Sequence, residues 1–142
     1  MNKGISIPPS LKNIYKELSN NFQDFNFNDG DLSPWASQGV LLINSILTVR
    51  KGKPGSHQDI GWQDFTDEVI KIISKRKKNI VFLLWGSFAK SKVVLIRNKK
   101  EHLILSSSHP SPFSAHKGFF GNNHFKKANE YLRNKSIVEI NW

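Results

Sequence analysis

The chain contains the apolar segment Ile80-Val81-Phe82-Leu83-Leu84-Trp85, which is followed by Gly86-Ser87. A short, continuous apolar run that ends in a Gly-Ser turn is typical of a strand in a parallel sheet. Before it, residues 64–78 have the pattern of an amphipathic helix, with acids in the first turn and basic residues in the last, as the helix dipole favours. We expect this helix to turn four apolar side chains toward the core: Val69, Ile70, Ile72 and Ile73.

Helices and strands alternate along the rest of the chain, as in a parallel sheet with crossover helices. A first helix is predicted to follow Pro9-Ser10, with Ser10 as its cap, and to end at about Asn20. Two further strands are predicted over residues 40–43 and 103–105, the first buried on both faces, and a last helix around residues 125–132. Periodicity alone makes residues 93–96 a strand, although short apolar runs are ambiguous.

Length and composition predict a single domain over residues 1–142 with a modest core, since 38% of the residues are hydrophobic. The 21 basic and 11 acidic residues give a net charge of +10, the sign expected of a protein that neutralises DNA phosphates. A solvated basic surface that results from a lysine-rich coding bias is the alternative explanation.

Cysteine is absent, which excludes disulfides and a cysteine-based zinc site and favours a reducing, cytoplasmic location. No apolar run reaches the roughly 18 residues of a membrane span, and the first residues lack the apolar region of a signal peptide. His57, His116 and His124 are too scattered for a metal site, so we expect neither a metal nor another cofactor. His57 either touches DNA or only shapes its loop.

A loop with the sequence His109-Pro110-Ser111-Pro112-Phe113 follows the strand predicted over residues 103–105. Its prolines stiffen the backbone, and its serine hydroxyls and free amides suit phosphate oxygens. The ring of Phe113 can be pushed into a base stack. His109 can stabilise charge that develops on a reacting group, whereas in an ordinary turn it only caps a backbone carbonyl.

Further motifs accompany this loop in a fixed order: Ile7-Pro8-Pro9-Ser10, residues 39–50, residues 81–87 and residues 114–125. With them, the chain resembles the uracil-DNA glycosylase family from about Pro8 to Trp142. The resemblance implies hydrolytic excision of uracil from DNA by cleavage of the N-glycosidic bond, the step that initiates base-excision repair. It also implies uracil-containing single- or double-stranded DNA as the partner, no membrane, no metal, and a monomeric protein.

The resemblance implies a fold as well, a three-layer α/β/α sandwich around a four-stranded parallel sheet, in which residues 93–96 are helical. The family's first strand would precede Pro8, and this sequence does not contain it. We therefore expect an incomplete sheet with unpaired apolar edges, which lowers the stability expected of the isolated chain.

The family's site residues match positions in this sequence one by one. Asn44, at a strand end, matches the asparagine that reads uracil, and its amide offers a donor and an acceptor that fit uracil but oppose those of cytosine. His109 matches the histidine that donates a hydrogen bond to uracil O2 as the departing base becomes anionic. Phe113 stands where most members carry leucine, as a bulkier wedge for the vacated stack. The residues expected to press on phosphates flanking the uridine are Pro8, Pro9, Ser10, Gly86, Ser87, Ser111 and Pro112.

Two segments of the family have no counterpart in this sequence: the water-activating loop G-Q-D-P-Y-H-G-P and the F-S-V segment whose phenylalanine stacks on the flipped uracil. Two functions therefore stay open. One is uracil-DNA glycosylase, with this chain as its C-terminal portion and an N-terminal fragment needed for completion. The other is a catalytically inactive, DNA-binding remnant of that enzyme, because an absent water-orienting group costs about 10² to 10⁴ in rate.

Overall fold

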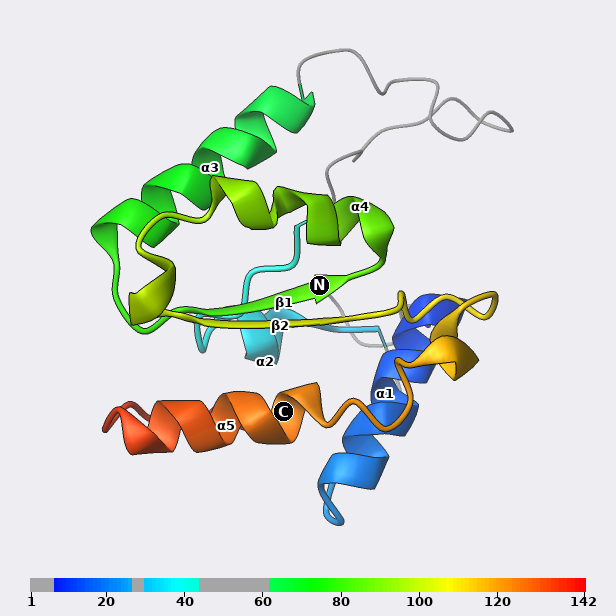
Figure 1. Ribbon diagram of the computed structural model, residues 1–142. Helices are drawn as coiled ribbons and strands as arrows, with labels where there is room; N and C mark the ends of the chain where they lie inside the picture. The colour runs from blue at the N-terminus through cyan, green and yellow to red at the C-terminus, as the bar shows by residue number, and fades with distance from the viewer. Residues whose placement is uncertain (1–6, 27–29, 44–61) are drawn as a thin grey trace.

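The computed structural model describes residues 7–26, 30–43 and 62–142, which form an α/β fold (Figure 1). Asn44 and His57, both singled out from the sequence, lie outside the described residues. Within the described ranges, every helix is too short or too polar to cross a membrane.

Two strands form the sheet in the described part of the chain, β1 (Val81–Trp85) and β2 (Leu103–Ser107). They run parallel, with Val81 opposite Leu103 and Trp85 opposite Ser107. The two strands predicted from the apolar runs are thus confirmed. Because the strands are parallel and in register, the segments that follow Trp85 and Ser107 leave the sheet at the same edge.

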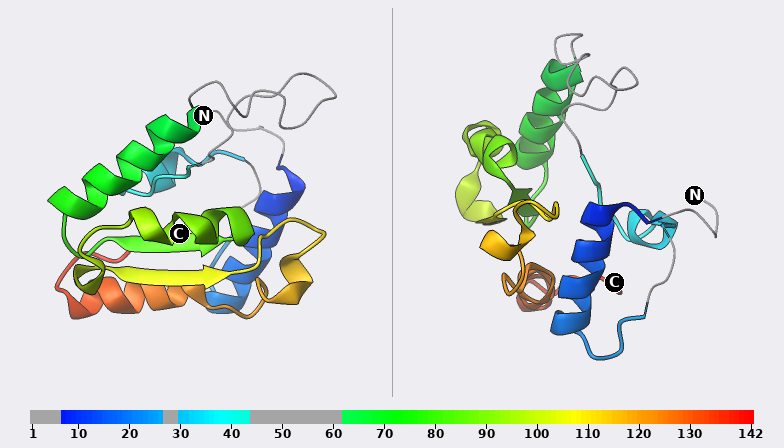
Figure 2. Two further views of the ribbon diagram at one scale, coloured as in Figure 1. Left: turned by 45° about the horizontal axis from the view of Figure 1, so that its top comes forward. Right: turned by 90° about the vertical axis from the view of Figure 1, so that its right-hand side faces the viewer.

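Helices cover both faces of this sheet (Figures 1 and 2). On one face lie α3 (Trp62–Arg76), α4 (Ser87–Lys90) and the 3₁₀ helix η1 (Ser91–Leu95). On the other face lies α5 (His124–Asn134), where the last helix was predicted. The three-layer arrangement is therefore confirmed, and so is the helical expectation for residues 93–96, most of which belong to η1.

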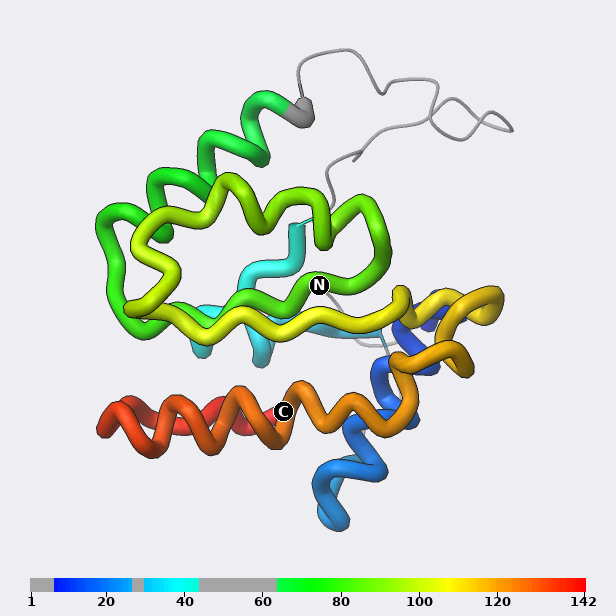
Figure 3. Tube along the Cα trace, in the orientation of Figure 1, coloured from blue at the N-terminus to red at the C-terminus, as the bar shows by residue number. Residues whose placement is uncertain are grey.

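The helix α1 (Pro9–Asn21) packs beside α5 and the loop after β2, and it contributes half of the core (Figure 3). Its existence and extent are confirmed, but the predicted cap is wrong: the helix begins at Pro9, and Ser10 lies inside it. Proline suits the first helical position because its φ is preset and its missing N–H is not needed there. The core cluster consists of Leu11, Ile14, Tyr15, Leu18, Trp35, Ala115, Phe119 and Phe125.

The strand predicted over residues 40–43 is wrong: this segment has no regular structure. Leu41, Leu42 and Ile43 are 62%, 49% and 39% exposed instead of buried on both faces. A strand needs a hydrogen-bonded neighbour, and none of the described segments pairs with this one. Apolar content alone therefore did not make it part of the sheet.

In α3, the prediction for Ile72 is also wrong, since that side chain is 47% exposed. Thr66 and Ser74 lie on the buried face of this helix. These two and Ile70 are one turn apart, whereas Ile72 is rotated by about 200° from both Ile70 and Ser74 and so faces the opposite side. Val69, Ile70 and Ile73 are half-buried.

Candidate functional site at the carboxyl ends of the strands

The register of the sheet places two predicted site segments next to each other. The Gly86 N–H donates to Ser107 O at 2.9 Å, so the ladder extends into the Gly86-Ser87 turn. Gly86 has φ +92° and ψ 164°, a backbone conformation that is nearly restricted to glycine. A Cβ on Gly86 would lie 3.2 Å from the Cβ of His109. The absent side chain of Gly86 therefore lets His109 lie against the turn.

The imidazole of His109 has a defined orientation and protonation. The Ser111 N–H donates to His109 Nδ1 at 3.0 Å, so Nδ1 must be an unprotonated acceptor. Partial burial lowers the pKa of His109, which favours the neutral ring. In a neutral imidazole with an accepting Nδ1, the proton is on Nε2. His109 thus offers Nε2–H as a hydrogen-bond donor toward a ligand.

The loop around His109, residues 108–114 and here called the His109 loop, is held by its own serines. Ser114 Oγ donates to the His109 carbonyl at 2.8 Å, and Ser108 Oγ donates to the Ser114 carbonyl at 2.9 Å. The hydroxyls of Ser111 and Ser114 lie 3.3 Å apart. Pro110 is fully buried. These contacts and the prolines make the loop a preorganised support for His109.

The remaining residues expected to contact DNA lie on the surface at this edge. Pro8, Pro9, Ser87 and Pro112 are exposed, while Ser10 and Ser111 are half-buried. Phe113 is 87% exposed, so its ring projects from the loop without a packing partner that covers it. Such an exposed ring on a stiff loop suits insertion between bases.

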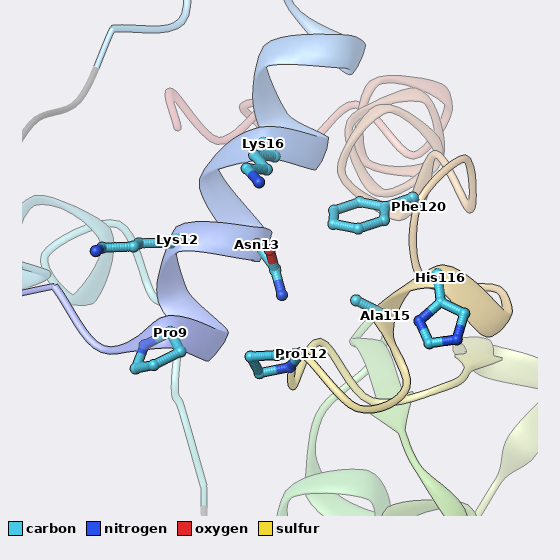
Figure 4. A pocket seen from close by; sticks show the side chains of 8 residues that line it. All are labelled: Pro9, Lys12, Asn13, Lys16, Pro112, Ala115, His116 and Phe120. Atoms are coloured by element: carbon cyan, nitrogen blue, oxygen red, sulfur yellow. The ribbon is translucent and has the colours of Figure 1, made fainter.

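A groove of about 360 Å³ opens between α1 and the segment after the His109 loop (Figure 4). Pro9 and Pro112 lie on its two sides at one end, so the groove begins where the expected DNA contacts are. Lys12 and Lys16 line it from α1, one helical turn apart. His116 and Phe120 also line it. The groove therefore combines positive charge with an aromatic ring.

Sequence reasoning missed a polar stripe on α1, formed by Asn13, Glu17 and Asn21, all of which are buried. Asn13 Nδ2 donates to the Pro110 carbonyl at 2.8 Å. The Glu17 carboxylate accepts the N–H of Gly121 at 2.8 Å and that of Asn123 at 3.0 Å. Asn21 Oδ1 accepts the N–H of Lys126 at 3.1 Å.

The stripe therefore ties α1 to successive points of the chain between Pro110 and Lys126. One signal in the sequence could have revealed it. The three residues recur at intervals of four, as neighbours on one helix face do, beside the apolar positions and apart from Lys12 and Lys16.

In the described part of the chain, no three histidine, aspartate or glutamate side chains are grouped so that they could hold a metal ion. Of the predicted site residues, the structure brings together Gly86 with His109, and Pro9 with Pro112. It does not describe Asn44.

Comparison with known proteins assigns residues 4–133 to a family model, the uracil DNA glycosylase superfamily. The uracil-DNA glycosylase of Borrelia duttonii (strain Ly) is 56% identical over 142 residues, which are 100% of this chain and 63% of that protein. The uracil-DNA glycosylase of Borreliella burgdorferi (strain ZS7) is 60% identical over 138 residues, 96% of this chain and 61% of that protein.

Among solved structures, the crystal structure of mimivirus uracil-DNA glycosylase matches with a TM-score of 0.88 and 29% sequence identity. The match covers 98% of this chain and 56% of the mimivirus chain. The present chain thus spans about 63% of the length of the curated relatives that it matches.

Proposed function

Because the chain belongs to the uracil-DNA glycosylase superfamily, we propose that it acts in the hydrolytic excision of uracil from DNA and supplies the residue that stabilises the leaving base. In this reaction the C1′–N1 bond breaks with its electron pair on uracil, and a water oxygen bonds to C1′. The proton that the water loses returns to uracil, which leaves an abasic sugar in the DNA.

The observation that carries the proposal is the donor geometry of His109. As the bond breaks, negative charge collects on the departing uracil, including its O2. A fixed, neutral donor stabilises such charge without reorganising, and His109 offers Nε2–H because Nδ1 is occupied by the Ser111 N–H. The lowered pKa of His109 supports this role, because the ring acts as a hydrogen-bond donor and not as a cation.

Holding the DNA is assigned to the loops at the same edge. We assign the phosphate contacts to Pro8, Pro9, Ser87 and Pro112 and the filling of the vacated stack to Phe113, and the exposure of all five supports this assignment. We assign uracil reading to Asn44, as the family motif implies. Excision further needs the water-orienting aspartate, and the 142 residues contain no G-Q-D-P-Y-H segment.

The experiment measures single-turnover release of uracil from a single-stranded, uracil-containing oligonucleotide. The 142-residue chain alone should give no release above background, and release should appear when a polypeptide with a relative's G-Q-D-P-Y-H segment completes the site. In the completed site, His109→Ala should lower the cleavage rate by about 10² to 10³-fold, as the loss of one oxyanion donor does. Its effect on DNA affinity should be much smaller.

Glu130→Ala is the control, because this exposed residue lies on α5, outside the residues assigned to the site. It should cleave at the unmodified rate. If His109→Ala cleaved equally fast, the leaving-group role would be refuted. If no polypeptide restored release while the chain still bound DNA, the inactive, DNA-binding remnant would be the correct reading.

A further inference from the structure

The peptide group between Pro110 and Ser111 is held at both of its polar atoms. Its carbonyl oxygen accepts Asn13 Nδ2–H at 2.8 Å, and its N–H donates to His109 Nδ1 at 3.0 Å. The peptide bond is trans, so the C=O and N–H of this rigid plane point in opposite directions. Asn13 and His109 are thus joined through a single planar unit.

We propose that Asn13 is a positioning residue for His109: its amide fixes the Pro110–Ser111 peptide plane, whose N–H in turn sets the orientation and tautomer of the imidazole. A rotation of this plane would carry the Ser111 N–H away from Nδ1. Without that donor, the proton is free to occupy Nδ1, and the ring would lose its fixed Nε2–H. Hydrogen bonds in a chain also polarise one another, so the Asn13 contact strengthens the second bond.

The surroundings of Asn13 fit this role. Its side chain lies in the interface between α1 and the His109 loop, with the amide nitrogen directed toward the loop (Figure 4). Asn13 is only 9% exposed and Pro110 is fully buried, so water does not readily replace the Asn13 amide as the partner of the carbonyl. A buried carbonyl that lost this donor would be left unsatisfied, and the plane would turn to find another.

The helix α1 adds a second consequence. Its first residue is Pro9, and Asn13 follows one turn later on the same rigid element. Displacement of the helix start by a bound DNA backbone would therefore move the group that holds the His109 plane. This consequence rests on the proposed function, whereas the link from Asn13 to His109 does not.

The test is nuclear magnetic resonance of ¹⁵N-labelled histidine side chains, which reports the tautomer and the pKa of each imidazole without any substrate. In Asn13→Ala, we expect the share of the Nε2–H tautomer of His109 to fall and its pKa to move up toward the ordinary value, because the loosened loop admits water. His102, which contacts Ile80 and Ser74 and lies before β2, serves as the internal reference and should not change.

Asn129→Ala is the matched control. Asn129 is equally buried, at 8% exposed, and its amide also holds a backbone segment, through the carbonyl and N–H of Ile140. Both variants should lose stability, but only Asn13→Ala should change the His109 signals. If the tautomer and pKa of His109 were the same in Asn13→Ala as in the unmodified protein, Asn13 would be purely structural and the proposal would be overturned.

Two further measurements decide the question if Asn13→Ala does not fold. Asn13→Gln keeps an amide donor on a longer stem, and it should restore part of the Nε2–H tautomer. In the unmodified protein, one side-chain amide proton of Asn13 should exchange as slowly as that of Asn129 and far more slowly than those of the exposed Asn134. Exchange of the Asn13 amide at the Asn134 rate would refute the contact.

The role of Asn13 and the proposed function can fail independently of each other. If Asn13→Ala changed the His109 signals while His109→Ala left uracil release intact, the positioning link would hold and the leaving-group role would be wrong. The reverse result would preserve the function and remove Asn13 from it.

Discussion

Among single residues, Gly86 determines where His109 can lie, because residue 86 has no side chain. Gly86→Ala would introduce a Cβ 3.2 Å from that of His109, at a backbone φ of +92°. Gly39 is the matched control, because its φ is +93° but nothing lies within 4 Å of its added Cβ. At either position a positive φ adds backbone strain of about 1–3 kcal/mol to an alanine variant.

We therefore expect Gly86→Ala to lower the free energy of unfolding more than Gly39→Ala in urea titrations. Only Gly86→Ala should also shift the imidazole resonances of His109. Equal losses in the two variants, with the His109 resonances unchanged in both, would show that the loop yields freely to the added methyl group.

Single residues also show what the sequence could predict. His109 was found because its prolines and serines are local neighbours in the chain. Asn13 was missed: its spacing with Glu17 and Asn21 marks a shared helix face, but its partner Pro110 is 97 positions away, and nothing in the sequence links the two. Polar residues on a helix ordinarily lie on the solvated face, and here it is the tertiary contacts that bury them.

At the scale of elements, a hydrogen bond joins the sheet to α5. The Trp85 indole N–H, at the end of β1, donates to His124 Nδ1 at 3.0 Å. The same indole packs edge-on against Phe119 at 5.1 Å and near Phe125 at 5.9 Å between ring centroids. Burial above all, and then the nearby Lys127 charge, lowers the pKa of His124 to about 4. The ring is therefore neutral in the folded state at neutral pH.

This contact predicts how stability depends on pH. The unfolded chain binds a proton at His124 near pH 6.5, whereas the folded chain does so only near pH 4. The contribution of His124 to the free energy of unfolding should thus be fully present above pH 6.5, fall as the pH drops from 6.5 to 4, and stay constant below. Urea titrations at several pH values measure it. The fall should shrink more in His124→Gln than in His109→Ala, since burial also lowers the pKa of His109 but by less, and an unchanged profile in His124→Gln would contradict this account.

Two segments mark the limit of sequence reasoning about elements. Residues 93–96 and residues 40–43 are both short apolar runs, and periodicity makes each a strand. The first is mostly 3₁₀ helix, and the second has no regular structure among the described residues. By contrast, residues 81–85 and 103–107 pair with each other. Whether an apolar run becomes a strand depends on a partner elsewhere in the chain, which a local pattern does not encode.

At the scale of the whole molecule, the net charge of +10 predicts DNA binding that weakens with salt, but it does not say where the DNA lies. The groove beside the His109 loop provides a location. Lys12 and Lys16 line it, and both stand at the same end of the molecule as the exposed Pro9 and Pro112. Lys77 and Lys100 are also exposed, but they precede β1 and β2 and so lie at the amino ends of the strands, opposite the site.

The two lysine pairs should differ in how they affect the salt dependence of DNA binding. For the unmodified protein, log K for a DNA duplex should fall linearly with log salt concentration as phosphate contacts release counterions. Replacing Lys12 and Lys16 with glutamine should make this slope shallower by about 1 to 2, because each lysine on a phosphate contributes close to one unit. Replacing Lys77 and Lys100 removes the same charge and should leave the slope nearly unchanged. Equal changes in both double variants would mean that the groove holds no phosphates and that DNA senses only the overall charge.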